Sequence, residues 1–573
     1  MSDARAQYLR WLSSGALSDA EIAELRAIER DDDEIESRFF KPLEFGTAGL
    51  RGIMGVGLNR MNVHTVRHAT QCFAETILRD CPVGARVAVC HDPRHNSRLF
   101  AVEAALVLAA NEISVLLFDD MRPTPLLSFA VRHYACAAGI NITASHNTSE
   151  YNGYKAYSPN GAQLPQDKTS SVAELMDRTD IFASPRLIDY NTATARGLIS
   201  PLGAETDELF MAEVIKLARD NPRLSGAAKS IRIVYTPFHG AGRELIPQTL
   251  LRLGYTSVYP VEAQMIPDGA FPTVASPNPE YPESFALAVE KAREVSADII
   301  IGTDPDSDRI AVLCKRGSEY VHLDGNKTGA LLLDYVIASR RRADALPSFP
   351  AALKTIVTTR LADAIATRHG VRSIDTFTGF KFMAEKKDEL EFSGTGNVVF
   401  AFEESYGYMP GDFTRDKDAV SAAVLIAEMA AWNRQLGMTP LDALALLERE
   451  YGIYIERTEN LVMPGVEGFF NMRRLMARMR SAPPENICGV AVIAASDYLA
   501  GIERAGGREK PIGLRGADVL RYDLSDGAAI FIRPSGTEPK IKVYVHVRAE
   551  NEASGLAAAN KYSLWARALP GMI

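Results

Sequence analysis

A pattern of strands and helices that recurs three times along the chain is the feature that most constrains its fold. In the first copy, apolar runs predict strands at 86–92, 114–119 and 137–143 and helices at 97–113 and 123–134. The second copy has predicted strands at 231–237, 257–261 and 298–302, a helix from Gly242 and a helix at 282–295. The third has predicted strands at 353–359, 372–377 and 397–402 and helices at 361–368 and 381–389. Alternating strands and helices predict three related α/β units.

The end of the chain follows a different pattern. Residues 518–549 alternate between apolar and polar side chains across a tight turn at 525–527, and a helix is expected from about Glu552. A polar stretch near 190–205 separates the first two copies. Because 573 residues are too many for one core, we expect three α/β domains and a C-terminal α+β domain.

Composition narrows the range of partners. The chain is 47% hydrophobic and 24% charged, as ordinary globular proteins are, and its net charge of -9 argues against nucleic acid. The N-terminus lacks the pattern of a signal peptide, and no apolar run is long enough to cross a bilayer. The six cysteines are scattered without metal-site spacing. We therefore expect a cytoplasmic protein with reduced, mostly buried thiols and neither a membrane nor a nucleic-acid partner.

Each copy ends in a polar loop just beyond a strand, where open α/β sheets bind ligands. The second of these loops, "GTDPDSDR", places Asp304, Asp306 and Asp308 on alternate residues. In an extended loop such carboxylates point to one side and can hold a hard divalent cation, for which Mg²⁺ is the natural candidate. A calcium EF-hand is excluded, because Arg309 and Lys315 stand where that loop needs glycine and glutamate. A phosphatase with an aspartyl nucleophile and a solvated acidic turn remain as alternatives.

The first loop, "TASHNTSEYNGYKAY" at 143–157, sets Ser145 beside His146, ahead of an Asn-Gly turn and Lys155. A Ser-His-Asp triad is rejected here, because adjacent residues on an extended chain point apart. A phosphorylated serine would bring about -1.5 to -2 charges and oxygens that ligate the cation of the aspartate loop. By itself, the stretch is equally consistent with a surface Asn-Gly turn.

Four further segments carry polar groups. The segment "RPSGTEPK" offers Arg533, two hydroxyls and the N–H groups around Gly536 as a cradle for a non-nucleotide phosphate, with a Pro/Gly hairpin as the alternative. The segment "FEESYGY" offers carboxylates and a serine that can bind sugar hydroxyls, although Glu pairs are often simply solvated. Taken alone, Lys381 in "TGFKF" would be an ordinary surface lysine, and "FGTAGLRG", which contains Arg51, would be a flexible loop.

With "TASHN" and "YNGYKAY", "GTDPDSDR", "TGFKF", "FEESYGY" and "RPSGTEPKIKVY" in this order, the chain closely resembles the α-D-phosphohexomutase family. Within that family it resembles the phosphoglucomutases, whose N-terminus reads G-T-A-G-L-R-G. One departure is Thr148, where family members commonly have proline after "SHN". The resemblance implies three α/β domains with mixed sheets and a C-terminal α+β domain around a central cleft. The domains are expected at 1–200, 201–320, 321–440 and 441–573, with one functional loop in each.

The resemblance also implies a role for each site residue. Ser145 is expected to be the phosphoserine and to share the Mg²⁺ with Asp304, Asp306 and Asp308. Proton transfer and charge stabilisation are expected from His146, Lys155, Lys381 and Arg51. Substrate binding is expected from Arg309, Thr378, Gly379, Glu403, Ser405, Arg533, Ser535, Gly536 and Thr537.

The activity that the resemblance implies is interconversion of glucose 1-phosphate and glucose 6-phosphate. The enzyme would use Mg²⁺ and a phosphoserine, with glucose 1,6-bisphosphate as intermediate and activator. Phosphomannomutase, phosphopentomutase and glucose 1,6-bisphosphate synthase activities stay open as alternatives, as do a sugar-phosphate phosphatase and a non-catalytic sugar-phosphate sensor. The expected partners are small sugar phosphates, and the protein is expected to be a monomer or a dimer.

Overall fold

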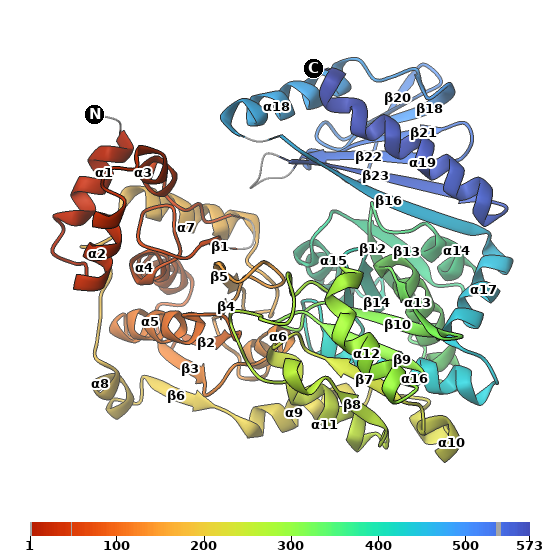
Figure 1. Cartoon of the computed structure of the whole chain (residues 1–573), viewed down its shortest axis with the longest axis horizontal. Helices are drawn as coiled ribbons and strands as arrows, with labels where there is room; N and C mark the ends of the chain where they lie inside the picture. The colour runs from red at the N-terminus through yellow and green to blue at the C-terminus, as the bar shows by residue number, and fades with distance from the viewer. Residues whose placement is uncertain (1–2, 47–48, 464, 535–539, 573) are drawn as a thin grey trace.

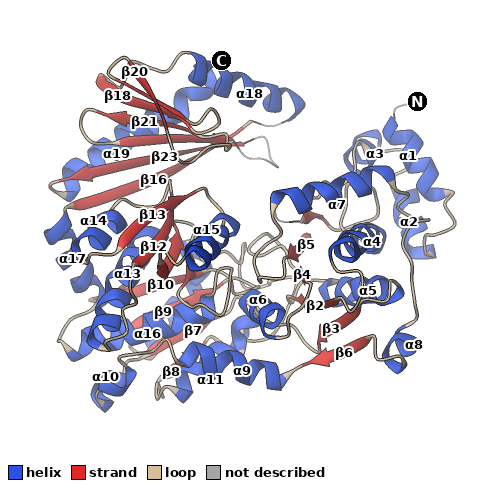
Figure 2. Ribbon diagram, turned by 180° about the vertical axis from the view of Figure 1, so that it is seen from behind, coloured by secondary structure: helices blue, strands red, loops and turns tan. Residues whose placement is uncertain are grey.

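The computed structural model describes residues 3–46, 49–463, 465–534 and 540–572. Four sheets, each built from its own stretch of chain, form four units that follow one another in space (Figure 1). The first unit lies beside both the second and the third, and the fourth lies on the third (Figure 1). Figure 2 shows the same units from behind, with helices beside each group of strands.

The first unit begins with three short helices and continues into a six-stranded sheet. The helices of this unit are α1 (Asp3–Leu12), α2 (Asp19–Ala27), α3 (Asp32–Phe39), α4 (Val63–Asp80), α5 (Ser97–Ala110), α6 (Thr124–His133), α7 (Gln166–Arg178) and α8 (Tyr190–Ala195). Its strands are β1 (Leu50–Ile53), β2 (Arg86–His91), β3 (Ser114–Phe118), β4 (Ala138–Ile142), β5 (Tyr151–Tyr157) and β6 (Ile199–Leu202), in the spatial order β1-β5-β4-β2-β3-β6.

The second and third units have smaller sheets. The second contains α9 (Ala204–Ile215), α10 (Gly226–Lys229), β7 (Ile233–Thr236), α11 (Leu245–Arg252), β8 (Val258–Pro260), α12 (Ala286–Glu294), β9 (Ile299–Thr303), β10 (Ile310–Arg316) and β11 (Glu319–Leu323). The third contains α13 (Gly325–Arg342), β12 (Pro350–Thr355), α14 (Leu361–Arg368), β13 (Arg372–Thr376), α15 (Phe380–Ser393), β14 (Asn397–Glu403), β15 (Gly407–Met409), α16 (Ala419–Gln435) and α17 (Pro440–Tyr451).

The fourth unit is an antiparallel sheet with two long helices, α18 (Gly465–Ser481) and α19 (Glu552–Ala568). Its strands are β16 (Ile453–Val462), β17 (Asn486–Ile487), β18 (Val490–Asp497), β19 (Ile502–Ala505), β20 (Arg508–Pro511), β21 (Leu520–Leu524), β22 (Ala529–Pro534) and β23 (Lys540–Ala549). The main order is β16-β23-β22-β21-β18-β19-β20, and β17 pairs with β18.

The first three sheets share one arrangement of four strands. The orders β5-β4-β2-β3, β10-β9-β7-β8 and β15-β14-β12-β13 are equivalent. In each, three strands run parallel and the fourth returns antiparallel beside the last of them. The functional loop of each unit is therefore the connection of an antiparallel hairpin at the carboxyl end of a parallel strand. The predicted fold class, three related α/β units with mixed sheets and a C-terminal α+β unit, is confirmed; the domain boundaries and the central cleft stay predictions.

Two local interpretations of the sequence were wrong. The segment 190–205 is not simply a polar stretch, because it contains α8 and the strand β6, which extends the first sheet next to β3. The pair Asn152–Gly153 is not a surface turn, because both residues lie buried in β5. A side chain at Gly153 would lie 2.5 Å from the carbonyl oxygen of Thr143 and 2.9 Å from that of Leu50, so glycine is needed for close packing.

The first three units share a continuous hydrophobic core. Helix α16 contributes much of it, since nearly all its residues are buried, and it packs against α9, α10, α11, α13 and α17. A smaller cluster joins the third unit to the fourth, with Ile356 and Val357 against Tyr498 and Phe531. The six cysteines are free and four of them are buried, as predicted. Among the described residues, no helix combines the length and the apolar character needed to cross a membrane.

The close packing at Gly153 leads to a first prediction. Gly153→Ala should destabilise the first unit by about 1–3 kcal/mol, as overpacking of a dense interior does, and should lower the midpoint of thermal unfolding. The matched control is Gly226→Ala, where an added methyl group meets no atom of the described residues within 4 Å. Equal midpoints for the two variants would contradict the packing argument.

Candidate active site

The loops of the first and second units meet at Ser145. Its hydroxyl, between β4 and β5, donates a hydrogen bond of 2.6 Å to Oδ2 of Asp304, which follows β9. The backbone N–H of Thr124, at the start of α6, donates to the carbonyl of Asp306 over 2.8 Å. The third unit also reaches the aspartate loop, because the N–H of Ala419 donates to the carbonyl of Ser307. Three units therefore converge on one loop.

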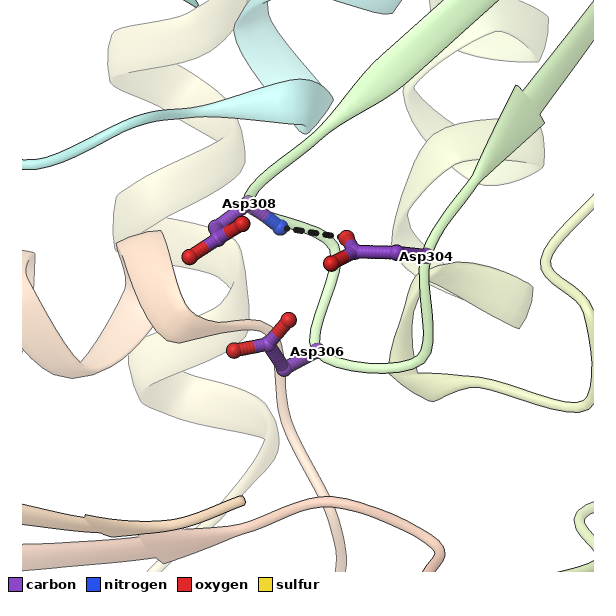
Figure 3. Close-up of side chains that lie close together, drawn as sticks. All are labelled: Asp304, Asp306 and Asp308. Atoms are coloured by element: carbon purple, nitrogen blue, oxygen red, sulfur yellow. Dashed lines mark hydrogen bonds between the residues drawn. The ribbon is translucent and has the colours of Figure 1, made fainter. Parts of the chain in front are cut away.

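The aspartate loop is a tight turn rather than the extended segment expected from the sequence. Ser307 has a left-handed backbone with φ of +52°, and its N–H donates to the carbonyl of Asp304. Oδ1 of Asp304 accepts the N–H groups of Asp308, at 3.1 Å, and Arg309, at 3.0 Å. The predicted convergence is nevertheless present, since one oxygen from each of the three carboxylates lies within 4.8 Å of the others (Figure 3).

Two buried lysines from other units neutralise this cluster. Nζ of Lys155, on β5, lies 2.7 Å from Oδ2 of Asp306 and 3.1 Å from Oδ2 of Asp308. Nζ of Lys417, just before α16, lies 3.1 Å from the same oxygen of Asp308. Burial opposes a charge on Asp308, but Lys155 and Lys417 outweigh it and hold the pKa of Asp308 well below its usual range. Burial and the other two carboxylates raise the pKa of Asp304 well above its usual range.

The cluster suits a divalent cation. Oδ1 of Asp306 and Oδ1 of Asp308 are buried without a hydrogen-bond partner in the described structure. Buried carboxylate oxygens without partners are costly, and a bound cation would satisfy them. All the available donors are hard oxygens, including the hydroxyl of Ser145, which is the donor set that Mg²⁺ prefers. The residues present therefore fit Mg²⁺.

Ser145 does not lie on an extended chain, which corrects the geometric reason for separating it from His146. Its φ of +52° is left-handed, and its Oγ lies 3.5 Å from Nδ1 of His146. Burial and the guanidinium groups of Arg309 and Arg51 hold the pKa of His146 well below its usual range. Positive charge on this imidazole is therefore disfavoured.

Arg51 and Arg309 lie at the rim of this cluster. Nη1 of Arg51 donates to Oδ1 of Asn147 in the serine loop, over 3.2 Å. Nη1 of Arg309 lies 2.6 Å from Oε1 of Glu280. The backbone of Arg309 pairs with that of Gly407, so the second and third functional loops are adjacent.

The predicted sugar-binding residues lie in the third unit. Glu403 is buried at the end of β14, and burial raises its pKa to about 7 against the opposing charge of Lys417. The hydroxyl of Ser405 lies 3.4 Å from a Glu403 oxygen. Thr378 and Gly379 precede α15, where the φ of +118° at Gly379 favours glycine.

Lys381 makes its hydrogen bond away from the aspartates. Its Nζ lies 3.5 Å from Oε1 of Gln166 in the first unit and 4.9 Å from the centre of the Phe382 ring. Burial lowers the pKa of Lys381. Lys381 thus faces the first unit, but the described contacts do not join it to Ser145.

The fourth unit contributes Arg533 from β22, which lies opposite Lys542 of β23. Ser535, Gly536 and Thr537 of the predicted phosphate cradle lie outside the described residues. Burial lowers the pKa of Lys542 although the carboxylates of Glu280 and Glu404 oppose the shift. Lys542 therefore shares an electrostatic environment with the loops of the second and third units.

Sequence analysis missed Lys417 and Lys542. A signal was available for Lys417, which stands between two aspartates, Asp416 and Asp418, shortly after the third functional loop. Lys542 follows Lys540 at the two-residue period of a strand, next to the predicted phosphate cradle, and so was a candidate for the same face of the sheet.

Four protein-family models match the chain in order. They are described as phosphoglucomutase/phosphomannomutase alpha/beta/alpha domain I, at residues 42–181, domain II, at 212–317, domain III, at 324–450, and the C-terminal domain, at 490–561. Together they cover most of the chain, and each of the first three includes one of the hairpin loops described above.

Curated relatives and solved structures point the same way. The chain is 35% identical over 526 residues to a phosphoglucomutase of Staphylococcus haemolyticus, covering 90% of this chain and 92% of the relative. It is 34% identical over 543 residues to that of Staphylococcus aureus, covering 91% and 95%. The open form of parafusin, a phosphoglucomutase from Paramecium, has a TM-score of 0.68 at 18% identity, covering 93% of this chain and 96% of that one. A phosphoglucomutase/phosphomannomutase family protein from Burkholderia thailandensis has a TM-score of 0.66 at 18% identity, covering 92% and 97%. At 18% identity, the structural similarity concerns the fold alone.

The fit of the aspartate cluster to a cation leads to a second prediction. Asp306→Asn removes one charge and should weaken Mg²⁺ binding, measured by calorimetry, by at least the roughly 10–100-fold that even an outer-shell loss causes. Asp298→Asn is the control, because Asp298 belongs to the same unit but pairs with Arg434 away from the cluster. An unchanged dissociation constant in the Asp306 variant would contradict the assignment.

Proposed function

The chain belongs to the phosphoglucomutase/phosphomannomutase family, and from that premise we propose that it is a phosphoglucomutase that interconverts glucose 1-phosphate and glucose 6-phosphate. The observation that carries this proposal is the bond between the Ser145 hydroxyl and Asp304. It places the serine oxygen next to a buried cluster of carboxylates that can bind a cation. This arrangement suits a serine that accepts a phosphoryl group and transfers it.

In the proposed reaction, Ser145 begins as phosphoserine. The free hydroxyl of a hexose monophosphate attacks the phosphorus, the bond from phosphorus to Ser145 Oγ breaks, and a 1,6-bisphosphate forms. The bisphosphate turns round and returns its other phosphoryl group to Ser145. Mg²⁺ held by Asp304, Asp306, Asp308 and the serine phosphate would neutralise charge on the transferring group.

His146 is proposed to exchange a proton with Ser145 Oγ, the oxygen that leaves phosphorus, because its Nδ1 lies 3.5 Å from that atom. The attacking hydroxyl approaches phosphorus from the opposite side. Lys381, whose pKa is lowered by burial, is the proposed acceptor of the proton that this hydroxyl loses. Lys155 and Lys417 are already committed as cations to the aspartates and are suited to stabilising negative charge. Arg51 and Arg309 add positive charge at the rim.

The groups at the other end of the substrate come from the third and fourth units. We propose that Glu403 and Ser405 bind sugar hydroxyls, with Thr378, Gly379 and Lys381 beside them. Arg533, together with Ser535, Gly536, Thr537 and the adjacent Lys542, would hold the phosphate that is not being transferred. After the bisphosphate turns round, the same groups hold its other end, so one cradle serves both halves of the reaction.

The surroundings of Asp304 argue against an aspartyl phosphatase. Oδ1 of Asp304 accepts two backbone N–H groups and Oδ2 accepts the serine hydroxyl. A carboxylate whose oxygens are both engaged is poorly placed to attack phosphorus. Ser145 Oγ takes part as a donor to Asp304, so its lone pairs stay free to carry the phosphoryl group.

The proposal also covers the metal, the activator, the partners and the cellular location. Mg²⁺ is the proposed metal and glucose 1,6-bisphosphate the proposed intermediate and activator. Small sugar phosphates are the proposed partners of a cytoplasmic monomer or dimer.

A third prediction tests the carrier directly. Ser145→Ala should abolish turnover of glucose 1-phosphate in a coupled assay and remove the mass of one phosphoryl group from the intact protein, because the transferring oxygen is gone. Ser149→Ala, in the same loop, is the matched control and should keep both. A fully active Ser145→Ala variant would refute the phosphoserine and restore the phosphatase alternative.

The sugar is tested with the wild-type protein. Glucose 1-phosphate should be turned over faster than mannose 1-phosphate or ribose 1-phosphate at equal concentration, and net release of inorganic phosphate should be negligible. A preference for mannose or ribose would reassign the substrate within the family, and binding without turnover of any of the three would favour a sensor.

A further inference from the structure

Arg94, between β2 and α5, donates hydrogen bonds to four carbonyl groups of the serine loop. Its Nη1 donates to the carbonyls of Thr148, at 2.7 Å, and Tyr151, at 3.1 Å. Its Nη2 donates to the carbonyls of Ser145 and Asn147. The side chain is fully buried, so water does not compete for these bonds. One guanidinium group thus holds the loop on both sides of its turn.

The carboxylate of Asp92 holds Arg94 and the loop together. Its Oδ2 lies 3.1 Å from Nε of Arg94 and accepts the hydroxyl of Thr143 at 2.7 Å. Thr143 Oγ1 in turn accepts the N–H of Ser145 at 2.9 Å. Oδ1 of Asp92 accepts the hydroxyl of Ser97. Ser145 is therefore tied at its N–H through Thr143 and at its carbonyl through Arg94, and both ties lead to the same carboxylate.

The loop needs this support because its conformation is strained. A left-handed backbone costs a residue with a side chain about 1–2 kcal/mol, and Ser145 has φ of +52°. Strained residues persist where the surrounding structure over-determines them. Members of the family commonly have proline at the position of Thr148, and threonine leaves φ free to rotate there. In this chain the four hydrogen bonds from the Arg94 guanidinium restrict the backbone of the loop instead.

The second unit covers Arg94 from the other side. The centre of the Phe271 ring lies 5.0 Å from Cζ of Arg94, and Phe271 is itself buried. A side chain on Gly269 would lie 2.4 Å from the backbone nitrogen of His95, so the chains of the two units are in direct contact there. The group that shapes the serine loop is thus packed against the unit that carries the aspartates.

We propose that Arg94 is a positioning residue for phosphoryl transfer, which holds the serine loop in the conformation that places Ser145 Oγ against Asp304. The inference rests on the proposed function, in which Ser145 carries the phosphoryl group. Arg94 itself acts through the backbone of the loop and does not touch the reacting atoms. Its loss should therefore affect the rate of transfer more than the binding of sugar phosphate, for which Glu403 and Arg533 are proposed.

Arginine is required for its shape as well as its charge. Both Nη atoms of Arg94 donate twice, in one plane and in fixed directions. Lysine offers a point charge with three donors and cannot reach four carbonyls arranged on two sides. Arg94→Lys therefore preserves the buried positive charge next to Asp92 but removes the planar group that donates the four hydrogen bonds.

The experiment compares Arg94→Lys with the wild type in kinetics and amide exchange. We expect kcat for glucose 1-phosphate to fall about 10–100-fold, as small misplacements of a reacting group do, with little change in KM. Amide exchange over residues 143–151 should accelerate in the same variant. Arg98→Lys is the matched control and should leave kcat and exchange unchanged. Within the described residues, Arg98 donates to a single carbonyl, that of Phe118, away from the loop.

A folded Arg94→Lys variant with wild-type kcat would overturn the proposal. So would a fall in kcat without faster exchange at 143–151, because Arg94 would then act by another route. If Arg94→Lys fails to fold, Thr143→Val provides the second test, since it removes the other tie to Asp92 while keeping the shape of the side chain. It should also lower kcat and accelerate exchange in the loop, and wild-type values for both would overturn the proposal.

The two readouts separate this inference from the proposed function. If the wild-type protein shows no mutase activity, the proposed function fails and the positioning role fails with it, whatever the exchange data show. If the wild type is active, the Arg94 and Thr143 variants decide whether the hydrogen bonds that hold the serine loop affect phosphoryl transfer.

Discussion

The burial of three carboxylates within 4.8 Å of one another is the constraint on which the rest of this structure depends. At an effective dielectric constant of about 20, two like charges about 4 Å apart repel by about 4 kcal/mol, so the cluster requires opposite charge. Lys155 supplies it from the first unit and Lys417 from the third. The negative charge of a loop in the second unit is thus balanced by lysines of the neighbouring units. The same ion pairs therefore form the site and hold the three units together.

The recurring four-strand arrangement explains how the neighbours come to be in reach. In each of the first three units, the functional loop connects a parallel strand to an antiparallel one. Each loop therefore lies at the carboxyl end of a parallel strand. The shared core around α16 packs the second and third units together, and Lys417 lies directly before that helix. Hydrophobic burial therefore brings the charged loops together, and the ion pairs select how they meet.

Much of this could be predicted from local sequence. Strands such as β2, β9 and β14 are apolar runs, α14 lies where its pattern predicts, and three alternate aspartates indicate a cation site. Contacts that depend on distant parts of the chain could not be predicted. The carbonyls of the left-handed residues Ser145 and Ser307 accept hydrogen bonds from Arg94 and Ala419, which lie far away in the sequence and which an extended-chain argument does not include. The glycine of "YNG" was interpreted as a turn because its reason for being small, the carbonyls of Thr143 and Leu50, comes from neighbouring strands.

The central claim is that Ser145 and the three aspartates form one site across two units. The most direct test is to titrate Mg²⁺ by calorimetry into fully phosphorylated and fully dephosphorylated protein, while measuring amide exchange at 143–157 and 302–309. A phosphate dianion beside the carboxylates repels them without a cation and bridges to them with one, so the phosphorylated form should bind Mg²⁺ more tightly. Both loops should then exchange more slowly in the phosphorylated, Mg²⁺-bound protein. Equal affinities and equal exchange in the two forms would show that the metal site is complete without the serine phosphate and would contradict the account.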